Sequence, residues 1–311
     1  MRNLDGWRLL EFWRSDLVVS RSSESVWVCG EALIDLFKNY HGVLEIVGGG
    51  PANTAKALAR LGLAVSFIGG ISSDERGYMI RKDMSGVDLR LAMTSRLPSA
   101  LAAVDIDTLG IASYDFRLFG TATFDFHRYW LPAGTPAALH IGSLATIVQP
   151  GADELFHWAK GIDAPIVFDP NVRPAVASDR AIYRDSVDRW ASISSIVKLS
   201  EDDLSWLGYQ DVSHFFALGV SLVVLTCGET GLSGITPEGR VSVPGVKVDV
   251  IDTVGAGDTV GAVIVEGLVK YGLETLKEEK LFEVLSRAAK AAAITCTRAG
   301  AKPPTLSELD T

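Results

Sequence analysis

Apolar and polar residues follow two different periods between residues 246 and 271. Residues 246–250 alternate between valine and polar side chains, which is the period of a strand with one buried face, so we predict a strand that ends near Asp252. Apolar residues from 260 to 271 recur at helical spacing and predict a helix that begins near Asp258. A strand, a short turn and a helix therefore follow one another here.

The turn between them is Gly255-Ala256-Gly257, with Asp258 directly after it. Small residues let backbone N–H groups approach a ligand, and the free N–H groups and dipole of a helix N-terminus bind anions such as phosphate. A carboxylate beside such a site would repel phosphate unless it had another role, such as taking the proton from an attacking hydroxyl. The alternative is that Asp258 caps the helix.

The string from residue 252 to 258 resembles the C-terminal signature of the ribokinase-like (PfkB) family of sugar kinases. The resemblance implies that the turn at residues 255–257 is the anion hole and that Asp258 is the catalytic base. In family members that bind potassium, the region of Asp252 and the turn near residues 298–301 supply mainly carbonyl ligands. It therefore also implies a candidate site for a monovalent cation.

A second Gly-rich string, at residues 47–53, precedes an Ala/Leu-rich helix at residues 54–61. It is a poor dinucleotide-binding turn, because Asn53 stands where a third glycine is expected. It resembles instead the N-terminal signature of the same family, which implies that Gly48, Gly49 and Asn53 contact the sugar.

Asp35 and the region of residues 97–128 offer further sugar contacts. Asp35 is flanked by apolar residues and needs a partner, which is either a turn, a salt bridge or two vicinal hydroxyls of a sugar. Residues 97–128 contain short alternating segments typical of antiparallel strands. The resemblance implies a small β-sheet lid over the sugar, built from about 36–46 and 97–128, with Arg117 as a substrate contact or else as an exposed charge. Because family members pair through their lids, we expect a homodimer.

From residue 138 onward, buried strand patterns alternate with helical ones, which predicts a parallel sheet with crossover helices. With the resemblance, the fold class is α/β, a ribokinase-like Rossmann-type three-layer sandwich with a central, mostly parallel sheet and a small β-sheet lid. We take residues 1–25 as an N-terminal extension and 26–305 as the kinase domain. The predicted strands of the large sheet are 26–29, 139–142, 165–169, 195–199 and 222–226.

Ligands of such sheets bind beyond the C-terminal strand ends, so the polar residues there are candidates. The string from Asp169 to Pro174 is common in the fructokinase and ketodeoxygluconate-kinase branches, and its Arg173 either clamps a phosphate or sugar or holds the loop through an ion pair. Thr226-x-Gly228-x-x-Gly231 resembles a nucleotide-side turn. No Gly-x4-Gly-Lys-Ser/Thr string is present, which excludes an ordinary P-loop kinase.

Ser200-Glu201-Asp202-Asp203 has the pattern of a capping box. The family often has Asn-x-x-Glu in this region, and that Glu acts on magnesium through water. Lys198 stands where the Asn would fall, with Glu201 in register, so the magnesium partner stays open among the three carboxylates. The resemblance assigns Lys198 to the ATP side.

Composition narrows the class of protein. The chain has 311 residues, 48% apolar and 22% charged, which is enough for a sizeable core. A formal charge of −9 and a pI near 5.1 argue against a nucleic-acid binder. The three cysteines stand far apart in apolar runs, which points to a reducing, cytoplasmic setting. No apolar run is long enough to span a membrane, and residues 1–25 lack the apolar core of a secretory signal.

These observations predict an enzyme that transfers the γ-phosphate of ATP to a sugar, with Mg²⁺ and, as in some members, K⁺. Asp35 and Asn53 suit neutral hydroxyls, so fructose phosphorylated at a primary hydroxyl is the first expectation. Ketodeoxygluconate, ribose and nucleosides stay open as alternative substrates. A catalytically inactive member that serves as a binding protein is the alternative from another class.

Overall fold

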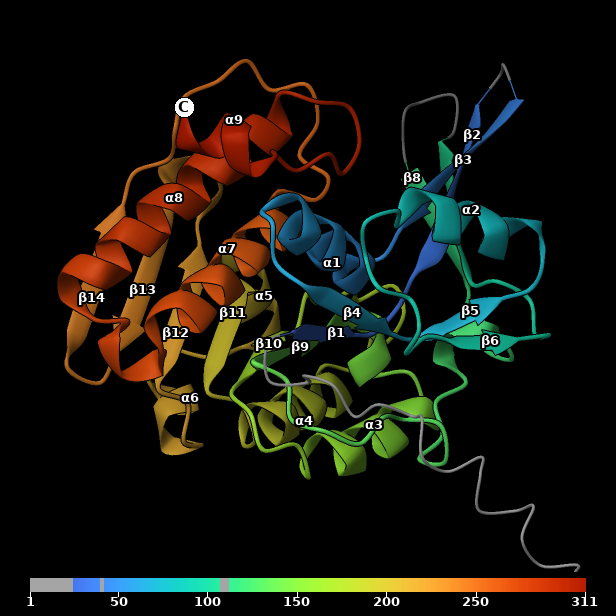
Figure 1. Ribbon diagram of the computed structural model, residues 1–311, viewed down its shortest axis with the longest axis horizontal. Coiled ribbons are helices and arrows are strands. Elements are labelled where there is room, and N and C mark those ends of the chain that lie inside the picture. Colours follow the sequence, from blue (N-terminus) through green and yellow to red (C-terminus); the bar gives the residue numbers. More distant parts are fainter. Residues whose placement is uncertain (1–24, 40–41, 107–111) are drawn as a thin grey trace, which may run out of the picture.

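A computed structural model describes residues 25–39, 42–106 and 112–311 (Figure 1). Its main element is an eight-stranded sheet in the order β14-β13-β12-β11-β10-β9-β1-β4, parallel from β12 to β4 and antiparallel at β13 and β14. The strands are β1 (Val26–Cys29), β4 (Val65–Ile68), β9 (Ala138–Gly142), β10 (Ile166–Asp169), β11 (Ile196–Ser200), β12 (Leu222–Thr226), β13 (Leu232–Thr236) and β14 (Gly239–Val243).

Helices cover both faces of this sheet, which Figure 1 shows as an upper and a lower layer. The alternation of β1 shows why: Val26 and Val28 belong to one hydrophobic core, and Trp27 and Cys29 belong to the other. The first core contains α1 (Gly50–Arg60), α7 (Ala256–Tyr271) and α8 (Glu278–Cys296). The second contains α3 (Gly151–Ala159), α4 (Arg180–Ala191), α5 (Glu201–Leu207) and α6 (Ser213–Ala217).

A separate four-stranded sheet stands to one side of the sandwich, in the order β3-β2-β7-β8 (Figure 1). It consists of β2 (Leu33–Asn39), β3 (Gly42–Gly48), β7 (Leu101–Ile106) and β8 (Ala112–Arg117). Both segments expected to form the small sheet thus contribute strands to it. The other elements are α2 (Glu75–Asp83), the two-stranded pair β5 (Gly70–Ser72) and β6 (Met93–Ser95), and α9 (Leu306–Asp310).

The strand predicted at residues 246–250 is wrong. These residues pair with no strand in the described part of the chain, and the side chains of Val246 and Val250 are 47% and 61% exposed. They form an extended segment after the edge strand β14, so the alternation has no neighbouring strand behind it. The helix that follows is confirmed, but it begins at Ala256, two residues earlier than predicted.

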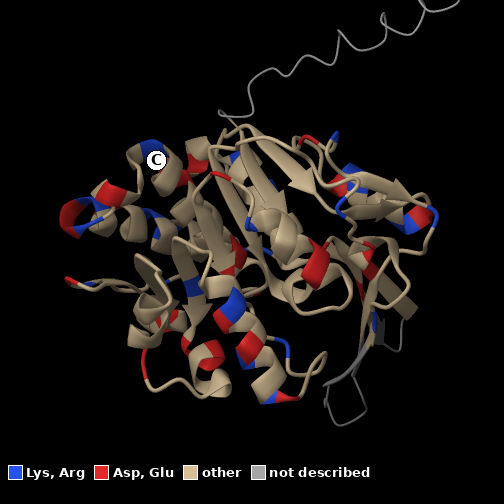
Figure 2. Ribbon diagram, turned by 90° about the horizontal axis from the view of Figure 1, so that it is seen from below, with Lys and Arg blue, Asp and Glu red and all other residues tan. Residues whose placement is uncertain are grey.

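The predicted strands of the large sheet are confirmed as β1, β9, β10, β11 and β12, with ends that differ by at most one residue. Within the described ranges, no helix is long and apolar enough to cross a membrane. Acidic and basic positions are interspersed over the helices and loops (Figure 2).

Candidate active site

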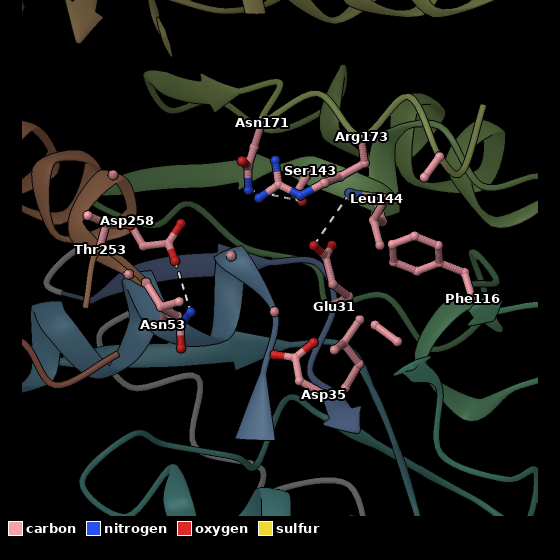
Figure 3. Close-up of a pocket in the computed structure, with 18 of the residues that line it drawn as sticks. Glu31, Asp35, Asn53, Phe116, Ser143, Leu144, Asn171, Arg173, Thr253 and Asp258 are labelled. Carbon is pink, nitrogen blue, oxygen red and sulfur yellow. Dashed lines mark hydrogen bonds between the residues drawn. The ribbon is translucent and has the colours of Figure 1, made fainter. Parts of the chain in front are cut away.

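A cavity of about 670 Å³ lies between the small sheet and the C-terminal ends of the parallel strands (Figure 3). Large-sheet loops after β1, β9 and β10, the start of α7 and one face of the small sheet all contribute to its wall. The lining residues used below are Glu31, Asp35, Phe37, Gly49, Asn53, Phe116, Ser143, Leu144, Asn171, Arg173, Lys198, Gly255, Gly257 and Asp258.

Asp258 lies in the first turn of α7, where the N-terminus of α1 meets it (Figure 3). Asn53 Nδ2 donates a hydrogen bond of 2.9 Å to Asp258 Oδ2, and Thr54 Oγ1 donates one of 3.4 Å to the Asp258 carbonyl oxygen. Removal from water raises the pKa of the Asp258 carboxyl, although the Asn53 hydrogen bond and the charges of Lys198 and Arg173 oppose the rise. A carboxylate with a raised pKa at the wall of a cavity is suited to accept a proton.

The turn before Asp258 is held rigidly. Gly255 has φ +79°, and a Cβ on it would come within 2.6 Å of the Ala301 Cβ, so a side chain there would both strain the backbone and clash. Asp252 accepts hydrogen bonds from the Val254 and Gly300 N–H groups at 3.0 and 2.8 Å, and these bonds hold the pKa of its carboxyl below the usual value. The first N–H groups of α7 are therefore fixed at the cavity wall, where helix geometry leaves them without intrahelical partners.

Lys198 lies beneath this turn in a buried ion pair. Its Nζ donates to Asp169 Oδ2 at 2.9 Å, with both side chains almost fully buried. Burial raises the pKa of Asp169 to about 6, against the charge of Lys198. Burial acts to lower the pKa of Lys198, but the Asp169 charge prevails and leaves it above its usual value. A Cβ on Gly257 would lie 3.1 Å from Lys198 Nζ, so this cation stands directly against the backbone of the anion hole.

The end of the cavity formed by the small sheet, away from Asp258, combines one carboxylate with apolar side chains. Asp35 projects into it from β2, and burial raises the pKa of its carboxyl to about 6 while the charge of Arg173 acts against the rise. A Cβ on Gly48 would come within 2.0 Å of Asp35 Oδ2, so only glycine leaves room for that carboxylate. Phe37 and Phe116 complete an apolar wall on the small sheet.

A family model described as pfkB family carbohydrate kinase matches residues 23–308. The chain belongs to this family. A fructokinase of Rhizobium leguminosarum bv. trifolii is 35% identical over 266 residues, covering 80% of this chain and 81% of the relative. Fructokinase-1 of Zea mays is 31% identical over 90% of this chain and 94% of its own.

Solved structures agree with the family. The fructokinase of Xylella fastidiosa with bound ATP superposes with a TM-score of 0.84 at 25% identity, over 92% of this chain and 97% of its own. A fructokinase variant of Vibrio cholerae O395 in a form with fructose, ADP and potassium ion bound gives a TM-score of 0.82 at 27% identity, over 94% and 98%. The predicted ribokinase-like α/β fold and the prediction of a carbohydrate kinase are both confirmed.

Several residues expected at the site of this kinase lie away from the cavity. Arg117 is exposed, and its neighbour Phe116 lines the cavity instead, because adjacent residues of a strand point to opposite faces. Glu201 and Asp202 are exposed in the first turn of α5. Asp203 is buried, and its carboxylate accepts the Ser200 and Val172 N–H groups, so the predicted capping box is confirmed.

The predicted nucleotide turn lies beyond β12 and outside the cavity lining. Thr226 ends that strand and pairs with Ser200 of β11. Gly228 and Gly231 have φ of +55° and +115°, and a Cβ on Gly231 would come within 2.1 Å of the Val243 carbonyl oxygen. This turn is thus a separate, glycine-dependent surface two strands away from β10.

The sequence did not single out two of the polar cavity residues, Glu31 and Ser143, whereas Asn171 lies in the candidate string at residues 169–174. Each directly follows or nearly follows a predicted strand, which is the position that the rule on strand ends picks out. Ser143 and Asn171 also have φ of +57° and +40°, which is strained backbone for non-glycine residues and often marks a functional site. Glu31 and Ser143 also follow strands, but a single polar residue after a glycine does not distinguish a site residue from an ordinary turn residue.

Proposed function

We propose that this kinase transfers the γ-phosphate of ATP to a primary hydroxyl of fructose. The observation that carries the proposal is the Asn53–Asp258 hydrogen bond at the mouth of the anion hole, inside a cavity of sugar size. The names of the relatives, fructokinase in a bacterium and in a plant, and the fructose bound to the Vibrio cholerae protein, support the choice of sugar.

The charges around the cavity also favour a neutral sugar. Glu31, Asp35 and Asp258 line it, while Lys198 is already paired with Asp169, which leaves Arg173 as the one lining cation without a carboxylate bonded to it among the described residues. An acid sugar such as ketodeoxygluconate would meet more negative than positive charge. Hydroxyl groups, which both donate and accept, suit carboxylate acceptors and the Asn53 amide.

In the proposed reaction, Asp258 accepts the proton of the attacking hydroxyl. The hydroxyl oxygen forms a bond to the γ-phosphorus as the bond from that phosphorus to the ADP oxygen breaks. The N–H groups of Gly255, Gly257 and Asp258 stabilise the charge on the transferred group, while the Ala256 N–H donates to the Thr253 carbonyl oxygen at 3.2 Å. Lys198 adds a fixed positive charge beneath the same backbone, and it also favours the ionised form of Asp258.

We assign the turn after β12 to ATP, with Thr226, Gly228 and Gly231. We assign the following residues to the sugar: Asp35, Gly48, Gly49, Asn53, Arg117 and Arg173. Arg117 lies on the face of β8 opposite to Phe116 and outside the cavity lining. The glycine-dependent turn after β12 offers a backbone that approaches a ligand closely, as ATP binding requires.

Magnesium fits as an ion carried mainly by the nucleotide. Among the described residues, no group of three or more His, Cys, Asp or Glu side chains could hold a metal by itself. Mg²⁺ keeps several waters and binds substrate phosphates with one or two carboxylates, and when bound it neutralises phosphate charge. We place Glu201 and Asp202 near it through water, and removal of divalent ions with EDTA should abolish turnover.

A monovalent cation near Asp252 is a further part of the proposal. The Asp252 carboxylate accepts the N–H groups of Val254 and Gly300 and so ties the anion-hole turn to the turn at Gly300, and carbonyl groups of these two turns would be the ligands of the ion. Replacement of K⁺ by tetramethylammonium should reduce kcat several-fold if a K⁺ ion orders these turns.

We also propose a cytoplasmic homodimer that pairs through the small sheet. β3 is an edge strand of that sheet, and Val43 and Leu44 on it are 58% and 56% exposed. Light scattering at micromolar concentration would contradict this if it gave the mass of a monomer.

An ADP-release assay with a panel of sugars tests the function. The panel contains fructose, ribose, ketodeoxygluconate and a nucleoside, because an aminoimidazole riboside kinase is also among the relatives at 28% identity. We expect the highest kcat/KM with fructose, and Asp258→Asn, whose kcat should be at least about a hundredfold lower, is the control for contaminating kinases. Turnover of ketodeoxygluconate without fructose would contradict the substrate, and no turnover of any sugar would favour a binding protein.

A further inference from the structure

Glu31 is a buried carboxylate that the proposed reaction does not use. It directly follows β1, is 1% exposed, and lines the cavity between Asp35 and Arg173 (Figure 3). Burial raises the pKa of its carboxyl to about 7. A buried carboxylate needs hydrogen bonds that compensate for lost water, so the hydrogen-bond partners of Glu31 indicate its role.

Those partners form one turn of the cavity wall. The Leu144 and Ala145 N–H groups donate to the two Glu31 oxygens at 3.4 and 3.1 Å, and the Ser143 side chain adds a hydrogen bond that favours the ionised form. These three residues open the 3-10 helix Ser143–Thr146 at the end of β9. Glu31 therefore connects the loop after β1 to the loop after β9.

The turn held by Glu31 is strained and is in contact with the next loop. Ser143 has φ +57°, and Asn171 has φ +40°. Asn171 Nδ2 donates to Ser143 Oγ at 3.3 Å, and Arg173 follows two residues later with its side chain in the cavity. Strained residues keep their conformation only when their surroundings hold them, and here the hydrogen bonds to Glu31 do so.

We propose that Glu31 is a positioning residue for the sugar: its ionised carboxylate holds the turn at Ser143 and, through it, the Asn171–Arg173 loop, so that protonation of Glu31 weakens sugar binding. This inference rests on the proposed sugar site. When Glu31 takes up a proton, one oxygen becomes a donor that faces backbone N–H donors, and the turn loses an acceptor. Sugar binding and proton release are then linked.

The other titratable groups near Glu31 have different pH ranges. Burial raises the pKa of Cys29 well above its usual value and that of Tyr183 to about 12, so both stay neutral near pH 7. Asp35, with its pKa raised to about 6, titrates one unit lower than Glu31 and is the group that the test must separate.

Isothermal titration of the full chain with fructose, without nucleotide, tests the linkage. Measurement in buffers of different ionisation enthalpy counts the protons released on binding. At pH 7 we expect the parent to release about half a proton, and its Kd to rise roughly tenfold between pH 7.5 and 6. Glu31→Gln should release almost none at pH 7 and bind more weakly with little change across this range. Asp35→Asn should keep the release at pH 7 wherever its binding is strong enough to measure.

Steady-state kinetics give a second readout. For Glu31→Gln we expect KM for fructose to rise about tenfold, with kcat and KM for ATP changed less than about threefold, because the anion hole lies in other loops. A role in folding alone would not produce this division.

Two results would overturn the inference: fructose turnover with pH-independent binding and no proton release by the parent, or a Glu31→Gln protein with the affinity and proton release of the parent. The parent measurement decides the matter if the variant does not fold. A parent that binds and phosphorylates no neutral sugar would overturn the proposed function and this inference with it.

Discussion

Carboxylates in the cavity and carboxylates near the C-terminus have opposite pKa shifts. Burial raises the pKa of two cavity-lining carboxylates, Glu31 to about 7 and Asp35 to about 6, and it raises to about 6 the pKa of Asp169, the buried partner of the lining residue Lys198. Near α9, hydrogen bonds from Thr305 and the charge of Arg298 lower the pKa of Glu308 to about 2. Figure 2 shows acidic and basic positions side by side on the surface elements near the C-terminus.

The difference lies in what surrounds each group. Surface carboxylates stay hydrated, and an ion pair with a nearby cation stabilises the fold only slightly. Buried carboxylates at the cavity lose their water, and no substrate is yet present to replace it. Asp169 has even one buried oxygen, Oδ1, without a partner in the described structure. These buried carboxylates therefore lower the stability of the fold at neutral pH, but they provide groups that can accept protons and bind hydroxyls.

The largest effect should follow from Asp258→Asn, which removes the proton acceptor and keeps its size. The new amide can still lie beside Asn53, so the protein should fold. We expect kcat to fall by roughly 10²–10⁴, with little change in ATP affinity because the anion hole is made of backbone. Rapid-mix and steady-state ADP release measure this. Turnover within a few-fold of the parent would show that Asp258 is not the proton acceptor; a capping role is already excluded, because Gly255 is the N-cap of α7 and no side chain caps it.

The next effect concerns the buried ion pair. Asp169→Asn leaves Lys198 without its bonded carboxylate inside the protein, and we expect the free energy of unfolding to fall by about 3–5 kcal/mol in urea titrations at pH 7. Asp153→Asn is the matched control, because it breaks an ion pair with Arg189 on the surface, where we expect less than about 1 kcal/mol. Equal losses for the two variants would remove the distinction between the regions.

The carboxylates of the two regions should affect the free energy of unfolding in different pH ranges. An acid whose pKa is raised on folding binds more protons in the folded state, so its contribution to stability falls as pH rises through that pKa. For Glu31, a rise from 4.5 to about 7 corresponds to on the order of 3 kcal/mol lost between pH 5 and 8, and Asp35 and Asp169 act in the same direction.

Glu308, with its lowered pKa, adds stability above its usual range that is lost as pH falls toward 2. We therefore expect urea unfolding of the ligand-free parent to show maximal stability near pH 5 and a decline to pH 8. Glu31→Gln should flatten that decline. A curve that rises steadily from pH 5 to 8 would contradict the raised pKa values in the cavity.

The smallest effect should come from Glu308→Gln. The carboxylate is exposed, its ion pair with Arg298 is screened by solvent, and the amide can still accept the Thr305 N–H bond. We expect Tm within about 3 °C of the parent and unchanged KM for both substrates. A loss of activity here would mean that the C-terminal helix acts on the site through the turn at Gly300.

Local patterns were sufficient where neighbouring residues determine the structure. The turn at Gly255–Asp258 and the strand β12 follow from residues within one short window, and so does the helix α1, although it begins at Gly50 and not at Thr54 as predicted. The segment at 246–250 shows the limit: alternation describes a strand with one buried face, but it contains no information on whether another strand lies beside it.

Contacts between loops that are distant in sequence could not be predicted. The role of Glu31 depends on β9 lying beside β1, and the pair Lys198–Asp169 depends on β11 lying beside β10. Asp35 was found because a carboxylate among apolar residues is conspicuous, and Asn53 because a family signature contains it. Glu31 has neither signal.

The place of β1 in the sheet has a consequence for how the chain folds. β1 pairs with β9, although Val26 and its partner Ala138 are separated by more than a hundred residues, which include α1 and the small sheet. During synthesis, β9 leaves the ribosome on the order of ten seconds after β1. Until then, one hydrogen-bonding edge of β1 has no partner, and closing so long a loop delays the central pairing. The arrangement that brings Glu31 to its turn thus makes the middle of the sheet a late event in folding.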